Sequence, residues 1–180
     1  MKKNLHILIA SDNKACRESL TRTLNSEPFF HVIGVCADTF AAVTMTDNTA
    51  PDIVIIDGST DPLATIEATK KITACSNANV IGISRVADSD FEKHLLAAGA
   101  LGYITHCSSD IELICAVEEV AKDNLYSCIN GNLRPVATRA RSSSVNQFIK
   151  QSVAGMKSNL RNKSAKATTN HWHDILQFAN

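Results

Sequence analysis

Apolar and polar residues alternate along the chain in blocks rather than singly. Five continuous apolar runs cover residues 6–10, 32–36, 53–56, 80–83 and 101–104. Unbroken apolar runs are typical of strands covered on both faces, as in a parallel sheet. The stretches between the runs are each long enough for one helix, so the pattern predicts a repeated strand-helix unit.

Capping signals support the expected helices. Asp61-Pro62 provides an N-cap followed by proline at the first helical position, and residues 89–92 and 109–112 both read Ser-x-x-Glu, the capping box. Five strands and five helices fit in about 125 residues. We therefore expect an α/β protein with the flavodoxin-like (βα)5 doubly wound parallel sheet, in strand order 2-1-3-4-5.

The pattern changes after Gly131, where arginines and serines replace the apolar runs. This composition is typical of a linker. Weak apolar periodicity around residues 145–153 and 171–178 indicates at most short helices. We expect one domain over residues 1–130 and a basic linker and tail over residues 131–180, partly disordered or with short helices.

The formal net charge of zero hides an asymmetry between these two parts. Residues 1–130 hold 10 Lys and Arg against 17 Asp and Glu, whereas residues 131–180 hold 8 against 1. The chain is an acidic body with a basic C-terminal tail. Such a tail is either a solvated segment or an arm that meets phosphate groups or an acidic surface.

The sequence disfavours both a secreted protein and a membrane-spanning one. The apolar run that follows Lys2 and Lys3 is too short for a signal-peptide core, and no other stretch approaches the length of a membrane span. The six cysteines include no Cys-x-x-Cys pair, so they are expected to be reduced thiols, most of them small buried hydrophobic side chains. We expect a cytoplasmic protein without membrane contact.

Polar side chains follow the apolar runs at the end where a ligand site is expected. Ser11, Asp12, Asp57, Ser84 and His106 all stand at or just past the carboxyl ends of predicted strands, which meet in one crevice of a doubly wound sheet. Two neighbouring carboxylates repel each other unless a cation lies between them. Hard oxygen ligands of this kind suit Mg²⁺, which would also neutralise an incoming phosphoryl group.

The order of these motifs resembles the receiver (CheY-like) domain of two-component response regulators. The residues that carry the resemblance are Asp12 after the first run, Pro51–Asp57, Ile83-Ser84 and Ala97–Tyr103. Residues 67–72 and the Tyr126 region resemble the LuxR/NarL-FixJ-type branch, although the chain lacks an intact helix-turn-helix pattern. The likeness covers about residues 4–130.

The resemblance implies a role for particular residues. Asp57 would be the phosphoacceptor, with Asp12, Asp57 and the main-chain carbonyl of Ser59 as Mg²⁺ ligands. Ser84 and Tyr103 would be the switch pair, the hydroxyl turning toward the phosphoryl group and the aromatic ring changing rotamer. The implied partners are a sensor histidine kinase or other phosphodonor and a downstream protein target. The chain is then a signalling module and not an enzyme, with no catalytic residues of its own.

Two positions depart from the family pattern. Ser11 stands where the family has a second acid, and His106 stands where it has a lysine that reaches the phosphoryl oxygens. A missing acid lowers metal affinity, and a histidine supplies positive charge only when protonated. We therefore expect a weakened Mg²⁺ site and phosphorylation that is weak, pH-sensitive or absent.

Several alternatives remain open from the sequence. One is a phosphorylation-independent pseudo-receiver that serves as a dimerisation scaffold, because the helix predicted over residues 110–122 has a wide apolar arc suited to a homodimer. Another is a transcriptional regulator with an eroded DNA-binding tail, since residues 169–176 resemble the end of a recognition helix. His106 with Cys107 is a further candidate, for a transition-metal site. A flavodoxin-like enzyme is disfavoured by the missing Gly-rich phosphate loop.

Overall fold

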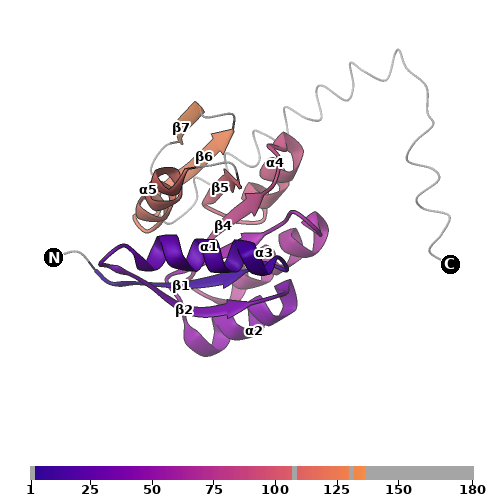
Figure 1. Ribbon diagram of the computed structural model, residues 1–180. Coiled ribbons are helices and arrows are strands. Elements are labelled where there is room, and N and C mark those ends of the chain that lie inside the picture. Colours follow the sequence, from indigo (N-terminus) through magenta and orange to yellow (C-terminus); the bar gives the residue numbers. More distant parts are fainter. Residues whose placement is uncertain (1–2, 107–108, 130–131, 137–180) are drawn as a thin grey trace, which may run out of the picture. The chain divides into compact units, whose positions relative to one another are not determined.

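The computed structural model describes residues 3–106, 109–129 and 132–136, which form one α/β unit. Its strands are β1 (Leu5–Ala10), β2 (Phe30–Cys36), β3 (Ile53–Asp57), β4 (Asn79–Ser84), β5 (Gly102–Thr105), β6 (Leu125–Ile129) and β7 (Asn132–Val136). Its helices are α1 (Lys14–Asn25), α2 (Thr39–Thr49), α3 (Pro62–Cys75), α4 (Ser89–Ala97) and α5 (Asp110–Val120). Every predicted strand and helix of the repeat is present (Figure 1).

The sheet order is β2-β1-β3-β4-β5-β6-β7. The predicted doubly wound fold and the order 2-1-3-4-5 are thus confirmed, and two further strands extend the sheet beyond β5. β6 pairs parallel to β5, and β7 pairs antiparallel to β6. The ordered sheet therefore continues to Val136, past the domain boundary predicted at residue 130.

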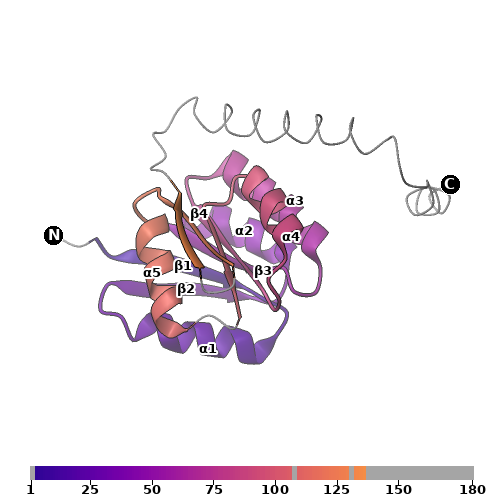
Figure 2. The ribbon, with the colours of Figure 1, turned by 90° about the horizontal axis from the view of Figure 1, so that it is seen from above.

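Helices cover both faces of the sheet, as the unbroken apolar runs require (Figure 2). On one face α1 and α5 enclose a core cluster that includes Ile9, Ile55 and Val117. On the other, α2, α3 and α4 enclose a second cluster that includes Leu8, Ile56 and Leu95. Alternate residues of each strand thus point to opposite cores, so the strand ends are held rigidly between two packed layers.

The wide apolar arc on α5 is explained mainly by the core. Leu113, Val117 and Val120 are buried, and Ile114 packs partly against the same cluster. Ile111 is the large apolar side chain of this helix that remains exposed, at 74%. The arc therefore gives little support for the homodimer that the sequence allowed.

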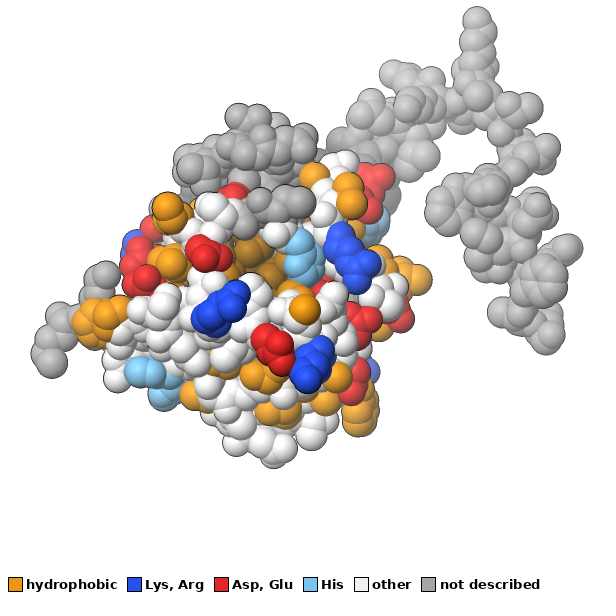
Figure 3. Space-filling model, viewed as in Figure 1, with side chains coloured by type: hydrophobic (Ala, Val, Ile, Leu, Met, Phe, Trp, Pro, Cys, Tyr) orange, Lys and Arg blue, Asp and Glu red, His pale blue; other side chains and the backbone are white. Residues whose placement is uncertain are grey.

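Charged side chains on the described surface are mixed in sign. Acidic and basic groups are interspersed on the face drawn in Figure 3. Several form pairs three residues apart in the sequence, such as Lys70 with Glu67 in α3 and Lys122 with Glu119 at the end of α5. Within the described ranges, no helix has the length and apolar character of a membrane span. The basic tail and its predicted DNA contacts lie outside these ranges.

Candidate functional site

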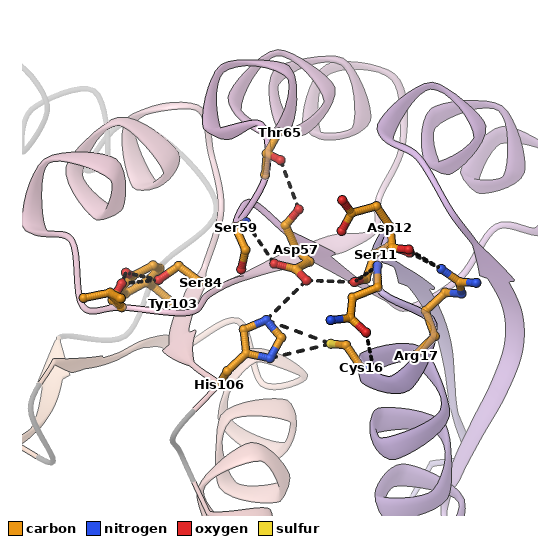
Figure 4. A network of polar contacts seen from close by, with 12 residues as sticks. Ser11, Asp12, Cys16, Arg17, Asp57, Ser59, Thr65, Ser84, Tyr103 and His106 are labelled. Atoms are coloured by element: carbon orange, nitrogen blue, oxygen red, sulfur yellow. Dashed lines mark hydrogen bonds and ion pairs between the residues drawn. The ribbon is translucent and has the colours of Figure 1, made fainter.

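Asp57 is the centre of a polar cluster at the carboxyl end of the sheet (Figure 4). Its Oδ2 accepts a hydrogen bond from the Ser11 hydroxyl at 2.7 Å and lies 3.2 Å from Nε2 of His106. Its Oδ1 accepts a hydrogen bond from the main-chain N–H of Ser59 at 2.9 Å. Both carboxylate oxygens are therefore held by neighbouring donors.

Strand register explains why these residues meet. β3 ends at Asp57 and lies between β1 and β4. Ser11 directly follows β1, and His106 follows the end of β5, where its N–H donates to the main-chain oxygen of Ser84 at 2.8 Å. Ser11 and His106 lie 46 and 49 positions away from Asp57 in the sequence. Parallel pairing of the strands brings both to the same carboxylate.

The Asp57 carboxylate is ionised in this setting. Its side chain is only 3% exposed. Burial alone raises the pKa of this carboxyl, but hydrogen bonds from His106, Ser59 and Ser11 outweigh burial and hold the pKa well below its usual range. An ionised carboxylate at neutral pH is what a nucleophile toward phosphorus requires.

His106 is the cationic partner of that carboxylate. Its hydrogen bond to Asp57, together with a contact to Cys16, raises the pKa of the imidazole to about 10. The ring therefore remains protonated at neutral pH. The sequence expectation of a titration near neutrality does not hold for this pair, because the neighbouring negative charge favours the imidazolium form.

Three contacts around Asp57 were not predicted from the sequence. Cys16, in the first turn of α1, places its Sγ 3.6 Å from Nδ1 and 4.0 Å from Nε2 of His106. Arg17 donates from Nη1 to the main-chain oxygens of Ser11 and Asp12 and so holds the β1–α1 loop. Thr65 donates to the main-chain oxygen of Asp57 at 3.3 Å.

The expected Mg²⁺ ligands lie close together and fit that ion in kind. Asp12 is exposed beside Ser11 and Asp57 (Figure 4), and Ser59 follows Asp57 by two residues. Mg²⁺ is usually held by one or two carboxylates together with waters and phosphate oxygens. Asp12 and Asp57 meet that requirement, although Ser11 contributes a neutral hydroxyl where a third carboxylate would strengthen the site.

Ser84 and Tyr103 are in direct contact. The Ser84 hydroxyl lies 2.6 Å from the Tyr103 hydroxyl and donates to the main-chain oxygen of Val86 at 2.6 Å. The Tyr103 hydroxyl also accepts a hydrogen bond from the N–H of Asp88, the N-cap of α4, at 3.1 Å. The tyrosine is fully buried, with its ring edge-on to Phe91. The pair therefore joins the strand next to Asp57 to the start of α4.

We expect a measurable coupling between these two hydroxyls. Tyr103→Phe should lower the free energy of unfolding by about 1 kcal/mol, since it removes hydrogen bonds to Ser84 and Asp88 while the ring stays packed. Urea unfolding of Tyr103→Phe, Ser84→Ala and the double variant forms a mutant cycle. Contacting partners should give an interaction energy of at least about 0.5 kcal/mol. Additive effects would contradict the contact.

Comparison with known proteins places this geometry in a family. Residues 7–118 match the family model of the response regulator receiver domain. The oxygen regulatory protein NreC of Staphylococcus epidermidis is 29% identical over 150 residues, which cover 82% of this chain and 65% of that protein. The chain thus spans about two thirds of the length of this longer relative.

Solved structures agree with the family match. A LuxR-family two-component response regulator from Aurantimonas shares 26% identity with a TM-score of 0.63, covering 84% of this chain and 99% of that one. The receiver domain of NarL from Mycobacterium tuberculosis has the same fold, with a TM-score of 0.63 at 21% identity over 67% of this chain and 98% of that one. The chain belongs to the response regulator receiver family of two-component signalling systems.

Proposed function

We propose that this receiver accepts a phosphoryl group on Asp57 from a histidine kinase or a small phosphodonor. The observation that carries the proposal is the 3.2 Å contact between the buried carboxylate of Asp57 and Nε2 of His106 at the end of β3. Asp57 ends the middle strand of the crevice, where ligands bind in doubly wound sheets. His106 takes the place of the family lysine with its charge retained.

The transfer uses few protein groups. A carboxylate oxygen of Asp57 bonds to phosphorus while the bond from phosphorus to the donor atom breaks, and the donor leaves with that electron pair. The donor atom is nitrogen in a phosphorylated histidine and oxygen in an acyl phosphate. The imidazolium of His106 stays within reach of the phosphoryl oxygens and compensates their charge, and the N–H of Ser59 orients the carboxylate. Mg²⁺, when bound by Asp12 and Asp57, adds positive charge to the same oxygens.

The signal leaves the site through the Ser84–Tyr103 contact. A phosphoryl group on Asp57 offers a new acceptor to the Ser84 hydroxyl, which then turns away from the main-chain oxygen of Val86 and breaks its contact with Tyr103. The loss of that bond also releases the hydroxyl that accepts from the N-cap residue of α4. Phosphorylation of β3 thereby changes the surface around α4.

The output of this module is a protein-protein contact. Phe40, Leu63 and Val86 are 79%, 76% and 74% exposed and come from the first turns of α2 and α3 and from the loop after β4. All three follow carboxyl ends of strands, as Asp57 does. Exposed large apolar side chains near a switch are suited to a protein partner. In this proposal the chain turns over no substrate beyond its own phosphorylation.

Transcriptional regulation is the second candidate function. The relatives include transcriptional regulatory proteins by name, such as LiaR of Bacillus subtilis. The residues that favour this output here are the 8 Lys and Arg against 1 acid in residues 131–180. Contacts of such a tail with DNA would be mostly to phosphates, so binding should weaken steeply with salt and show little sequence preference.

A phosphoryl mimic tests the proposed function without a kinase. Full-length protein with Mg²⁺ and beryllofluoride should show a higher Tm than with Mg²⁺ and fluoride alone. Ligand at about 100 times its Kd stabilises by about 2.7 kcal/mol. Asp57→Asn should lose this shift while remaining folded. An unchanged Tm in the parent would favour the pseudo-receiver alternative, and an equal shift in Asp57→Asn would place the site elsewhere.

A further inference from the structure

Cys16, Asp57 and His106 bring a thiol, a carboxylate and an imidazole to one point between α1 and the carboxyl end of the sheet (Figure 4). One ligand atom from each of the three lies within 4.8 Å of the other two. The proposed phosphorylation uses Asp57 and His106 but gives Cys16 no role. Among the described residues, Cys16 is the cysteine that joins such a cluster.

We propose that Cys16, His106 and Asp57 form a binding site for a divalent transition metal of the zinc type. Sulfur, imidazole nitrogen and a carboxylate oxygen are the three ligand types that Zn²⁺ accepts. Thiolate and imidazole are softer than the all-oxygen set that suits Mg²⁺. Zn²⁺ and Mg²⁺ would therefore share Asp57 as a ligand but differ in the others. Zn²⁺ would take Cys16 and His106, and Mg²⁺ would take oxygen ligands.

The spacing of the ligand atoms is close to that of a tetrahedral site. Zinc bonds of about 2.0–2.3 Å at tetrahedral angles separate neighbouring ligand atoms by about 3.4–3.6 Å. Nε2 of His106 lies 3.2 Å from Oδ2 of Asp57 and 4.0 Å from Sγ of Cys16. The Cys16 sulfur therefore has to approach Nε2 by about 0.4 Å, and it lies within 4.8 Å of the Asp57 ligand atom.

Space for a further ligand is present next to the cluster. Cys16 and His106 also line a pocket of about 90 Å³ between α1 and α5, together with Ser19, Thr23 and Asp110. This volume holds at least one water molecule. A metal with three protein ligands and an open fourth position has access to solvent from this side.

The metal-bound cluster carries no net charge. A divalent metal has charge +2, a thiolate from Cys16 and the carboxylate of Asp57 each have charge −1, and a coordinating imidazole of His106 is neutral. Any protons that these ligand atoms hold leave to solvent when the metal binds. The site therefore buries no net charge.

One consequence rests on the proposed function. A metal held by Asp57 and His106 takes the nucleophile and its cationic partner out of the phosphorylation site. Zinc binding and phosphorylation of Asp57 are then mutually exclusive, and metal-loaded protein stays in the unphosphorylated form.

Cobalt provides the spectroscopic test. Co²⁺ added to the full-length reduced protein should produce a thiolate-to-Co²⁺ charge-transfer band. Cys16→Ser should lose the band, while Cys75→Ser, on an exposed cysteine at the end of α3, and Cys107→Ser should retain it. A band that survives Cys16→Ser, a band lost in Cys107→Ser, or no band in the parent would overturn the proposal.

Affinity for Zn²⁺ gives a second readout. In competition with a chromogenic chelator, at a fixed excess of Mg²⁺, Cys16→Ser and His106→Gln should each bind Zn²⁺ more weakly than the parent by more than the roughly 10–100-fold typical of outer-shell partners. Equal affinity in the parent and in both variants would overturn the proposal. Use of two variants guards against a folding defect in one of them.

Phosphorylation of the zinc-loaded protein separates this inference from the proposed function. With Mg²⁺ and a phosphodonor, the zinc-free parent should be modified and the zinc-loaded parent should not. If zinc binds through Cys16 but the zinc-free parent is never modified, the proposed function fails and the zinc site stands. If the zinc-loaded parent is modified as fast as the zinc-free one, Asp57 is not a ligand and the site as proposed is wrong.

Discussion

His106→Gln should lower the free energy of unfolding at pH 6 by about 1.5–3 kcal/mol, the usual worth of a hydrogen bond to a charged group. The variant leaves the Asp57 carboxylate, 3% exposed, with the Ser11 and Ser59 donors but without a cation. Urea unfolding measures the loss. His94→Gln, on a histidine of α4 whose ring contacts the main chain of Asp90, is the matched control and should cost far less.

The cost of His106→Gln should depend on pH in a defined direction. The pKa of His106 is raised from 6.5 to about 10, so its stabilisation is complete below pH 6.5 and is lost as pH rises toward 10. The pKa of Asp57 is lowered, so its stabilisation is present above its ordinary value of 3.8 and lost in acid. The difference in unfolding free energy between the parent and His106→Gln should be largest between about pH 4 and 6.5. A difference that grows toward pH 10 would contradict the ion pair.

The same substitution should slow phosphorylation. The imidazolium contact is worth about 1.5–3 kcal/mol if it is kept in the transition state, so its removal slows the transfer by about 10–150-fold. His106→Lys keeps a cation at this position and should be phosphorylated at least as fast as the parent. Initial rates with one small phosphodonor at pH 7 compare the three proteins. Equal rates for parent and His106→Gln would mean that the imidazolium does not assist the transfer.

Ser11→Asp should create strong Mg²⁺ dependence of stability. The Ser11 hydroxyl donates to Oδ2 of Asp57 at 2.7 Å, so an aspartate there replaces a donor by a second negative charge. Without metal the variant should lose at least about 1–3 kcal/mol of unfolding free energy. With Mg²⁺ at about 100 times its Kd, about 2.7 kcal/mol should return, because the ion then lies among three carboxylates.

Thermal unfolding with and without Mg²⁺ measures this effect. Ser11→Asn is the matched control, since it changes size in the same way without adding charge. The parent and Ser11→Asn should gain less from Mg²⁺ than Ser11→Asp does. Equal gains in all three proteins would show that Ser11 does not limit the metal site.

The sequence predicts the fold well because apolar runs and caps are local signals. The repeat, the strand order and the meeting of Ser11, Asp57 and His106 all follow from parallel strands ending at one edge. The extra strands β6 and β7 were not predicted. Their one strong sequence signal is the Asn130-Gly131 dipeptide, typical of a tight hairpin. Pro135 weakens the strand signal, yet it is tolerated because β7 is an edge strand.

The chemistry of the site is less visible in the sequence. Helical spacing assigns Cys16 to an apolar stripe with Leu20 and Leu24, and nothing local shows that its sulfur faces His106, 90 residues later. The high pKa of His106 likewise depends on the carboxylate next to it and not on its own sequence neighbours. The Cys16 contact arises from the packing of α1 against the strand ends, and the pKa of His106 arises mainly from the position of Asp57 across the sheet. Periodicity alone specifies neither.

Intact-protein mass after incubation with Mg²⁺ and a small phosphodonor tests most directly whether Asp57 accepts a phosphoryl group. We expect the parent to gain one phosphoryl group and Asp57→Asn to gain none, because Asp57 is the buried carboxylate that contacts His106 at the end of β3. A parent that never gains mass, or an Asp57→Asn protein modified to the same extent as the parent, would show that Asp57 is not the acceptor.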